Sequence, residues 1–355
     1  MVETSDLLLR RFRNQGLAGD GFERVEDVVR WFGAVQGQDI LASLWALGLR
    51  VPISTEARIE KAIEDGEILR TWPMRGTIHF VPAEDARWML DLMTPRIVAR
   101  SAKRYRDLDL DEKAFESARE EIRAILEGGK VVTRPDLMLY LESRGISTSG
   151  QRGYHILYHL AQQGLLCLGP REGKQQTVVL LDEWVPESRN LTRKESLAEI
   201  ATKYFRSHGP ATLHDFVWWT GLTVADCRVA MDGISSRLEE WKDGDRTLWH
   251  MPTGDEGEPE RIMLLPFVDE YMVGYRDRSD FLKPEYTERT FHGLMSVVIS
   301  DGEIVGMWKR KLAAKKVTVE LDLFRDLDGD ESRSLNNTLR RYGEFLGRDA
   351  ELSGA

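Results

Sequence analysis

One order of elements recurs along the chain, and it constrains the fold more than any other feature of the sequence. Apolar residues repeat at helical spacing in several short segments, and two apolar segments separated by a polar turn then follow. Helices followed by a β-hairpin are typical of a winged helix-turn-helix unit. In the first occurrence we expect helices at residues 7–15, 25–34, 40–47 and 55–65, strands at 68–71 and 77–81, and a helix at 83–92.

The same order returns twice further along the chain. The second occurrence predicts helices at 112–126, 133–143 and 152–163, then strands at 165–168 and 177–181, with the polar residues 169–174 as the wing tip. The third predicts helices at 197–207, 213–219 and 224–231, then strands at 236–241 and 247–251. We therefore expect three related winged-helix units in tandem.

The remaining residues differ from this pattern and predict a C-terminal α+β domain. The turn Asp301-Gly302 joins two alternating segments, and Asp-Gly is a strong hairpin signal because type I′ turns need positive φ. Strands are expected at 263–265, 293–300, 303–308 and 316–323, and a helix at 333–346. The overall class is thus α+β, with domains predicted at 1–106, 107–190, 191–258 and 259–355.

Composition excludes several classes of protein. The 42% hydrophobic and 30% charged content is that of a folded, water-soluble chain, and no window approaches the roughly 18 uninterrupted apolar residues of a membrane span. The acidic N-terminus, residues 1–6, does not resemble a signal or transit peptide, so we expect a cytoplasmic location. Cys167 and Cys227 lie far apart without metal-ligand spacing, and we expect both to be buried thiols.

The net charge of −10 argues against a nucleic-acid partner, since many DNA-binding domains are basic. The charges are nevertheless unevenly distributed. Residues 96–106, 189–194 and 309–316 are locally basic, whereas acids concentrate at 107–121, 239–260 and 322–331. A basic face on an acidic protein is therefore feasible, and the alternative is that each run is an ordinary solvated surface.

Four motifs together resemble one known family. They are TWPMRGTIH at 71–79, WWTGL at 218–222, LPFVDE at 265–270 and VGMWKR at 305–310. In this order they resemble the AlkZ/YcaQ family of winged-helix DNA glycosylases over nearly the whole chain. The resemblance implies a C-shaped stack of the three units around double-stranded DNA. It also implies a monofunctional DNA glycosylase, expected as a monomer, that hydrolyses the N-glycosidic bond of alkylated purines, with bulky adducts or interstrand crosslinks as further substrates.

The family's catalytic Gln-x-Gln motif corresponds to Gln36 and Gln38. Gly37 departs from the family's usual apolar middle residue and could loosen the backbone, and Asp39 adds a carboxylate of unknown direction. On the residues alone, such a triplet would be read as ordinary loop or cap amides. A carboxamide has no pKa near neutrality, so its expected role is to position water. A purine alkylated at N7 or N3 is already a cationic leaving group, and the expected mechanism uses neither a metal nor an organic cofactor.

Cations at two places are candidate DNA contacts. Arg75 lies on a glycine-flanked turn and could contact phosphate. The segment 308–316 lies between two expected strands, as does the family's DNA-probing hairpin, and the alternative is a solvated turn. Its five cations are Lys309, Arg310, Lys311, Lys315 and Lys316.

Two further residue types are assigned to structure rather than chemistry. Asp269 and Glu270 follow an apolar segment, and we expect them to be buried in pairs with Arg276 or Arg278. Four tryptophans could stack on DNA bases but are expected to be core residues instead: Trp31, Trp72, Trp218 and Trp219.

Competing functions remain at this point. Winged-helix units serve as transcription regulators far more often than as enzymes, so a non-catalytic DNA-binding protein is the main alternative. A self-resistance enzyme dedicated to one bulky adduct is a narrower form of the same class. An unrelated hydrolase is disfavoured because the sequence has no GxSxG, HExxH, phosphate-loop or Cys/His motif.

Overall fold

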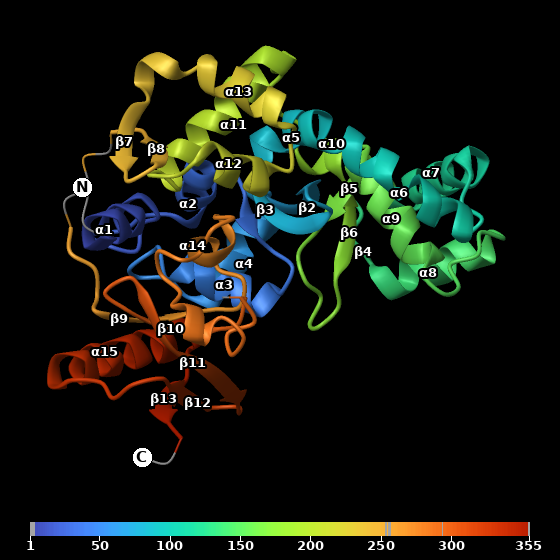
Figure 1. Ribbon diagram of the computed structural model, residues 1–355. Helices are drawn as coiled ribbons and strands as arrows, with labels where there is room; N and C mark the ends of the chain where they lie inside the picture. Colours follow the sequence, from blue (N-terminus) through green and yellow to red (C-terminus); the bar gives the residue numbers. More distant parts are fainter. Residues whose placement is uncertain (1–3, 253, 255–256, 293, 354–355) are drawn as a thin grey trace. The chain divides into compact units, whose positions relative to one another are not determined.

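The computed structural model describes residues 4–252, 254, 257–292 and 294–353, and it confirms the predicted α+β class (Figure 1). The chain divides into two compact units. One contains residues 1–59 and 197–355, and the other contains residues 60–196. The two divisions fall within helices α4 (Glu56–Glu64) and α11 (Arg193–Ser207).

The unit of residues 60–196 is built on an antiparallel sheet whose strands run in the order β3-β2-β5-β6-β4. The strands are β2 (Ile68–Met74), β3 (Thr77–Pro82), β4 (Val132–Thr133), β5 (Leu166–Leu168) and β6 (Thr177–Leu180). Its helices are α5 (Ala86–Met93), α6 (Pro95–Asp107), α7 (Glu112–Leu126), α8 (Arg134–Ser143), α9 (Arg152–Gln162) and α10 (Leu181–Trp184), with a 3₁₀ turn at Ala83–Asp85.

Helix α7 shows how the sequence specifies this unit. Asp111 accepts a hydrogen bond from the Ala114 N–H and caps the helix. Phe115, Ala118 and Ile122 then follow at intervals of three and four residues, so they share one face and are buried in the core. The helix predicted at 112–126 is therefore confirmed at both ends.

The other unit combines helices with a five-stranded sheet. The helices are α1 (Thr4–Asn14), α2 (Val25–Phe32), α3 (Ile40–Gly48), α11, α12 (Leu213–Thr220), α13 (Val224–Asp232), α14 (Glu270–Val273) and α15 (Gly329–Leu346). The sheet order is β13-β12-β11-β10-β9, from β9 (Ile262–Leu265), β10 (Val297–Ser300), β11 (Glu303–Leu312), β12 (Lys316–Leu323) and β13 (Asp349–Leu352). Strands β7 (Glu239–Asp243) and β8 (Arg246–His250) form a separate hairpin, and β1 (Val35–Gln36) is a two-residue strand.

The structure corrects several expected elements. Helix α6 was not predicted, because Tyr105 is its one buried residue and the sequence shows no apolar repeat there. Strand β11 continues to Leu312, well past the predicted end at 308, and β13 was not foreseen. The strand expected at 293–300 begins at Val297, and residue 293 lies outside the described residues.

The two cysteines are buried free thiols, as expected. Burial raises the pKa of Cys167 to about 12 and that of Cys227 to about 11. Among the described helices, none combines the length and the apolar character that a membrane crossing requires.

We expect the stability of the 60–196 unit to decrease on acidification because of His159. Its ring stacks on Phe115 with centroids 3.9 Å apart, and burial lowers the pKa of His159 to about 4. The unfolded chain takes up a proton near pH 6.5 while the folded chain does not, so stability is lost as pH falls from about 6.5 to about 4. The loss should be on the order of 2 kcal/mol.

Denaturant titrations at several pH values would measure this slope. His159→Phe should flatten it, whereas His214→Gln, at an exposed position on α12, should leave it unchanged. A slope that survives in His159→Phe would contradict this explanation.

Candidate active site

The Gln36-Gly37-Gln38 segment connects two helices and is held at both ends. Helix α2 ends at Gly33, which has φ of 81° and lies so close to Lys203 that an added Cβ would meet its Cδ at 2.6 Å. At the other end Asp39 is the N-cap of α3, because its Oδ1 accepts a hydrogen bond from the Ala42 N–H at 3.0 Å. The Asp39 carboxylate therefore points toward the N-terminus of α3, where it caps the helix.

The Gln36 side chain folds back on its own backbone. Its Oε1 accepts hydrogen bonds from the N–H groups of Gly37 and Gln38, each at 3.2 Å. The carboxamide oxygen is thus engaged locally, which leaves the amide NH₂ as the group that can donate to a substrate or a water. Gln36 is half-buried, Gly37 is buried and Gln38 is exposed.

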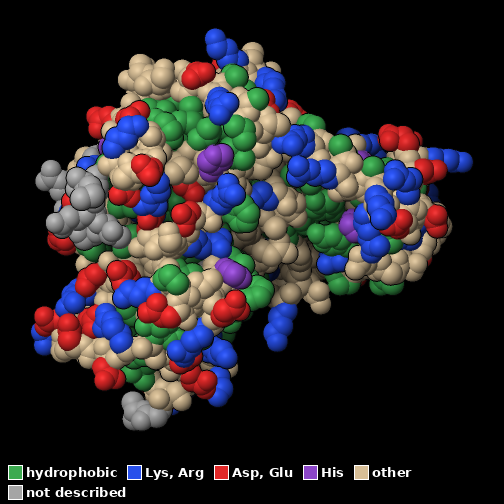
Figure 2. All heavy atoms as spheres, viewed as in Figure 1, with side chains coloured by type: hydrophobic (Ala, Val, Ile, Leu, Met, Phe, Trp, Pro, Cys, Tyr) green, Lys and Arg blue, Asp and Glu red, His purple; other side chains and the backbone are tan. Residues whose placement is uncertain are grey.

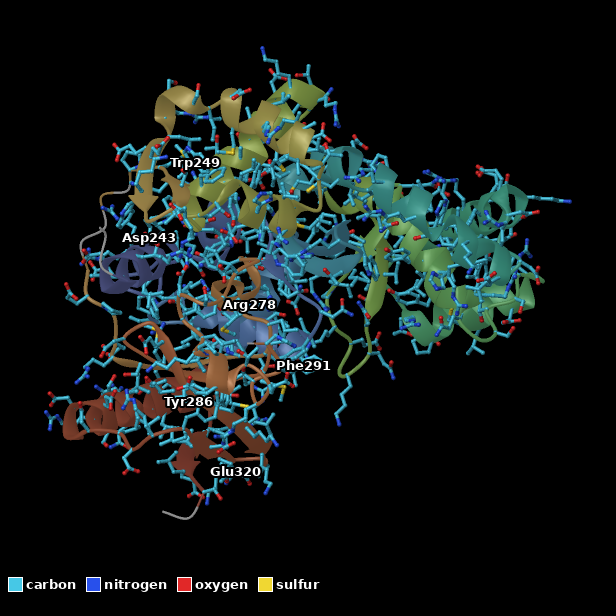
Figure 3. The ribbon with its side chains drawn as sticks, viewed as in Figure 1. Asp243, Trp249, Arg278, Tyr286, Phe291 and Glu320 are labelled. Carbon is cyan, nitrogen blue, oxygen red and sulfur yellow. The ribbon has the colours of Figure 1, made fainter. Side chains whose placement is uncertain are left out.

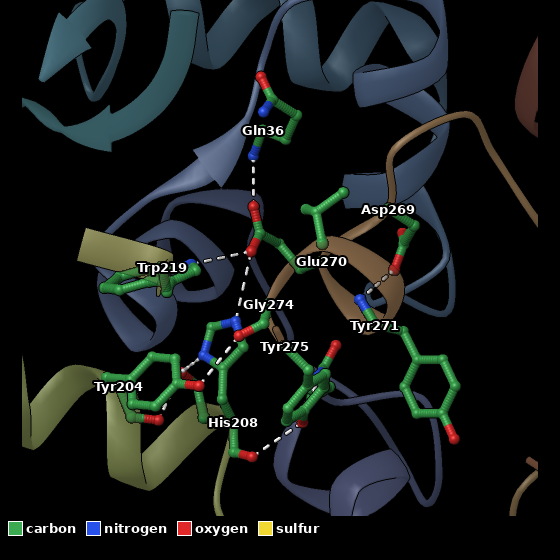
Figure 4. Close-up of polar contacts among 12 residues, drawn as sticks. Gln36, Tyr204, His208, Trp219, Asp269, Glu270, Tyr271, Gly274 and Tyr275 are labelled. Atoms are coloured by element: carbon green, nitrogen blue, oxygen red, sulfur yellow. Dashed lines mark hydrogen bonds and ion pairs between the residues drawn. The ribbon is translucent and has the colours of Figure 1, made fainter. Parts of the chain in front are cut away.

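A buried carboxylate lies behind this segment (Figure 4). Glu270, the first residue of α14, accepts a hydrogen bond from the Gln36 backbone N–H at 2.7 Å through Oε1. Its Oε2 accepts from Trp219 Nε1–H at 3.1 Å and lies 3.3 Å from His208 Nε2. Glu270, His208 and Trp219 are all fully buried.

His208 is in turn fixed on its other sides. Its ring stacks on Tyr204 with centroids 4.7 Å apart and planes 13° apart, and its Nδ1 lies 2.8 Å from Ser207 Oγ. The Tyr204 hydroxyl donates to the Gly274 carbonyl, one residue after α14. These contacts join α11, α12 and α14 to the loop that carries Gln36.

The neighbouring Asp269 has a separate partner. Its two carboxylate oxygens accept from Nη1 and Nη2 of Arg50, both at 2.9 Å, and both residues are fully buried. The expected pairing of Asp269 and Glu270 with Arg276 or Arg278 is corrected, since the partners found are Arg50, Gln36, Trp219 and His208. The Arg278 guanidinium donates to the Met272 and His292 carbonyls (Figure 3).

Arg75 lies in the two-residue turn between β2 and β3, with φ of 54° followed by 77° at Gly76. Positive φ at both positions is the geometry of a type I′ hairpin turn. Arg75 Nη2 lies 3.3 Å from Nε2 of His79, a buried residue whose Nδ1 contacts the Thr77 carbonyl at 3.0 Å. Arg75 is thus half-buried within its own hairpin.

The cationic segment 309–316 is not the loop that was expected, because Lys309, Arg310 and Lys311 belong to strand β11. Three of its five cations bind neighbours on the sheet or on helix α15. Lys311 pairs with Glu320 at 2.5 Å (Figure 3), Lys316 pairs with Glu351, and Arg310 donates to the Tyr342 hydroxyl. Lys309 and Lys315 make no ion pair within the described residues, so they remain the two cations best able to meet phosphate.

Helix α6 presents a stronger basic surface, which the expected site did not include. Arg96, Arg100, Lys103 and Arg104 recur at intervals of one helical turn and are exposed. In the part of the chain that is described, Arg100 and Lys103 form no ion pair, and Arg104 donates to Gln151 at the N-terminus of α9. Figure 2 shows Lys and Arg side chains gathered over this part of the surface. The local excess of base at 96–106 was its sequence signal.

No three His, Cys, Asp or Glu side chains of the described residues are grouped as a metal site would require. The polar groups around Gln36 are instead carboxamides, a carboxylate, an imidazole and an indole. Of these groups the carboxamides of Gln36 and Gln38 are the ones exposed enough to hydrogen-bond to water or sugar.

Comparison with known proteins decides the family. Residues 29–345 match the family model described as DNA glycosylase AlkZ-like. The chain belongs to this AlkZ-like family of DNA glycosylases. A curated relative of this AlkZ-like chain is the "Interstrand DNA cross-link repair glycosylase" of Streptomyces sahachiroi, 26% identical over 302 residues, which are 80% of this chain and 81% of the relative.

A solved structure has the same fold as this AlkZ-like chain. The "Streptomyces sahachiroi DNA glycosylase AlkZ" superposes with a TM-score of 0.80 at 21% sequence identity, covering 99% of this chain and 100% of the other. The family makes the protein a monofunctional DNA glycosylase, an enzyme of DNA repair.

We expect Asp39→Asn to leave base excision within about twofold of wild type. The Asp39 carboxylate caps α3, and Asn is an equally good N-cap, so the motif should keep its geometry. Single-turnover excision would measure the rate, and thermal unfolding would confirm the fold. Asp39→Ala, which removes the cap, should cost about 1 kcal/mol of stability. A tenfold slower Asp39→Asn enzyme would show that the charge itself takes part in catalysis.

Proposed function

We propose that this glycosylase removes cationic N7- or N3-alkylated purines from double-stranded DNA and leaves an abasic site. We further propose that its substrates extend to bulky adducts or interstrand crosslinks. The printed name of the Streptomyces sahachiroi relative, an interstrand cross-link repair glycosylase, supports this range. Crosslinks made through purine N7 would present the same cationic leaving group.

The observation that carries the proposal is the ordered state of the Gln36-Gly37-Gln38 segment. The backbone N–H groups of all three residues donate to a carboxylate or a carboxamide oxygen, so the segment is preorganised without substrate. Gln36 offers its NH₂ group from a half-buried position, and Gln38 is exposed on the same short segment. Two carboxamides on such a segment can hold one water by donating to it and accepting from it.

The proposed step needs no strong base. The water oxygen bonds to C1′ as the bond from C1′ to the purine nitrogen breaks, and the electron pair neutralises the cationic base. The attacking water loses one proton to solvent. Holding that water in line with the breaking bond converts an encounter into a positioned reaction. The carboxamide dipoles would also stabilise positive charge that develops on the sugar.

We propose that the DNA is held by three winged-helix units within 1–106, 107–190 and 191–258, followed by the α+β domain of 259–355. Helices α7, α8 and α9 with strands β5 and β6 have the order of such a unit, as do α11, α12 and α13 with β7 and β8. A cytoplasmic monomer acting on duplex DNA is the simplest form of this proposal. We retain six cations as proposed DNA contacts: Arg75, Lys309, Arg310, Lys311, Lys315 and Lys316.

Replacing either glutamine should slow excision of N7-methylguanine from a duplex by at least about tenfold, which is about 1.4 kcal/mol of transition-state stabilisation. The variants are Gln36→Ala and Gln38→Ala, and the measurement is alkaline cleavage at abasic sites under single-turnover conditions. An unmodified duplex serves as the control. If wild type binds the duplex but releases neither N7-methylguanine nor a bulkier N7 adduct, the non-catalytic DNA-binding alternative would be favoured.

Reversing charge on α6 should weaken DNA binding without changing the chemistry. We expect Arg100→Glu/Lys103→Glu to raise the Kd for an undamaged duplex about tenfold at low salt, and to reduce the slope of log K against log salt by about 2. Excision at saturating enzyme should stay within about threefold of wild type.

The matched control for α6 is Lys113→Glu/Arg123→Glu on α7. It makes the same charge change at exposed positions of the same unit, on a helix rich in glutamates. Equal weakening by both pairs would show a general charge effect and would remove α6 from the interface.

A further inference from the structure

We propose that Glu270 is a positioning residue for the catalytic glutamines, and that it acts through the backbone of Gln36. The inference rests on the proposed role of Gln36 and Gln38. Glu270 does not contact substrate in this scheme. It fixes the point from which the Gln36 carboxamide is aimed.

The contacts of Glu270 assign one function to each of its oxygens. Oε1 accepts from the Gln36 N–H at 2.7 Å, which is shorter than the contacts of Oε2 with Trp219 and His208. Oε2 accepts from Trp219 at 3.1 Å and faces His208 at 3.3 Å (Figure 4). Trp219 lies on α12 and His208 lies in the turn between α11 and α12, and both hold the carboxylate from the side opposite Gln36.

The hydrogen bonds around His208 show which of its ring nitrogens carries a proton. Ser207 Oγ lies 2.7 Å from the Lys203 carbonyl, which can only accept, so the hydroxyl hydrogen points there. The same Oγ must therefore accept from His208 Nδ1–H at 2.8 Å. With Nδ1 protonated, the contact between Nε2 and Oε2 of Glu270 also needs a proton between the two atoms. That proton joins the two groups, so the fully buried carboxyl group of Glu270 is not left unpaired.

The consequence for the motif follows from three consecutive N–H groups. Glu270 accepts from Gln36, and the Gln36 side chain accepts from Gly37 and Gln38. If the first bond is lost, the part-buried Gln36 N–H is left without its partner and the short strand β1 can shift. The carboxamide that starts from this strand would move with it. A displacement of about 1 Å in a positioned catalytic group can cost about 100-fold in rate.

If Glu270 only stabilised the fold, its variants would be expected to give a different result. Any change that breaks the buried pair would then lower stability, and the rate of the folded enzyme would be unaffected. Asp269 provides the matched comparison, since it is the adjacent residue, is equally buried and pairs with Arg50 without contacting Gln36.

Three variants separate the effect of the length of the Glu270 side chain from the effect of its charge. Glu270→Asp keeps the negative charge beside His208 but withdraws it by one methylene from Gln36. Glu270→Gln keeps the reach, because its amide oxygen can accept from Gln36 while its NH₂ donates to a neutral His208, although the hydrogen bond from Trp219 is lost. Asp269→Asn removes the charge of the neighbouring ion pair, and Asn, an equally good N-cap, can still accept from the Tyr271 N–H at the start of α14.

We expect Glu270→Asp to slow single-turnover excision at least about tenfold with an unchanged Kd for the lesion duplex, and Glu270→Gln to stay within about threefold. Asp269→Asn should lower the Tm but keep the wild-type rate at a temperature where it is folded. Hydrogen exchange over residues 35–39 should accelerate in Glu270→Asp and not in Asp269→Asn, which gives a readout independent of activity.

The inference is overturned if folded Glu270→Asp excises at the wild-type rate, or if Asp269→Asn loses as much activity as Glu270→Asp. Either outcome would overturn the role of Glu270 alone. The proposed function would still be supported if the wild-type enzyme releases the base and Gln36→Ala does not. Absence of release by wild type would instead defeat the proposed function, and the inference with it.

Discussion

Two adjacent carboxylates, Asp269 and Glu270, are buried completely, and the unit that contains them depends on how they are satisfied. A charge in a protein interior is tolerated when it is paired and hydrogen-bonded. Here the two neighbours turn to opposite partners, Asp269 to the Arg50 guanidinium and Glu270 to His208, Trp219 and Gln36. One short helix, α14, therefore ties α2, α3, α11 and α12 and the loops between them into a single arrangement, and the candidate catalytic segment is part of it.

Local features of the sequence were sufficient for most elements. Helix α7 was predicted at both ends because its cap and its apolar spacing lie within the helix itself. Helix α6 was missed because a helix with one buried residue carries no apolar repeat, and the C-terminal end of β11 was missed because charged residues occupy its outer half. Pairing with β12 overrides their composition, since each backbone group of the ladder gains a partner.

The candidate site likewise contains some residues that could be predicted from the sequence and others that could not. Gln36 and Gln38 were found through a family resemblance, and the Asp39 cap is a local feature. Glu270 could not be connected with them from sequence, because it lies 234 residues from Gln36, 62 from His208 and 51 from Trp219. The predicted partners were arginines close to it in sequence, but the Arg278 guanidinium donates to backbone carbonyls. Burial brings together residues whose separation along the chain gives no sign of contact.

The buried thiols have a chemical consequence for an enzyme proposed to work where reactive electrophiles modify DNA. Thiolates are the strongest nucleophiles that a protein offers to such reagents. Cys167 and Cys227 are enclosed, and their raised pKa values keep almost all of each sulfur protonated at neutral pH. The protein thus presents no soft nucleophile of this kind from either cysteine, so the agents that damage the genome would leave these two positions of the repair enzyme chemically intact.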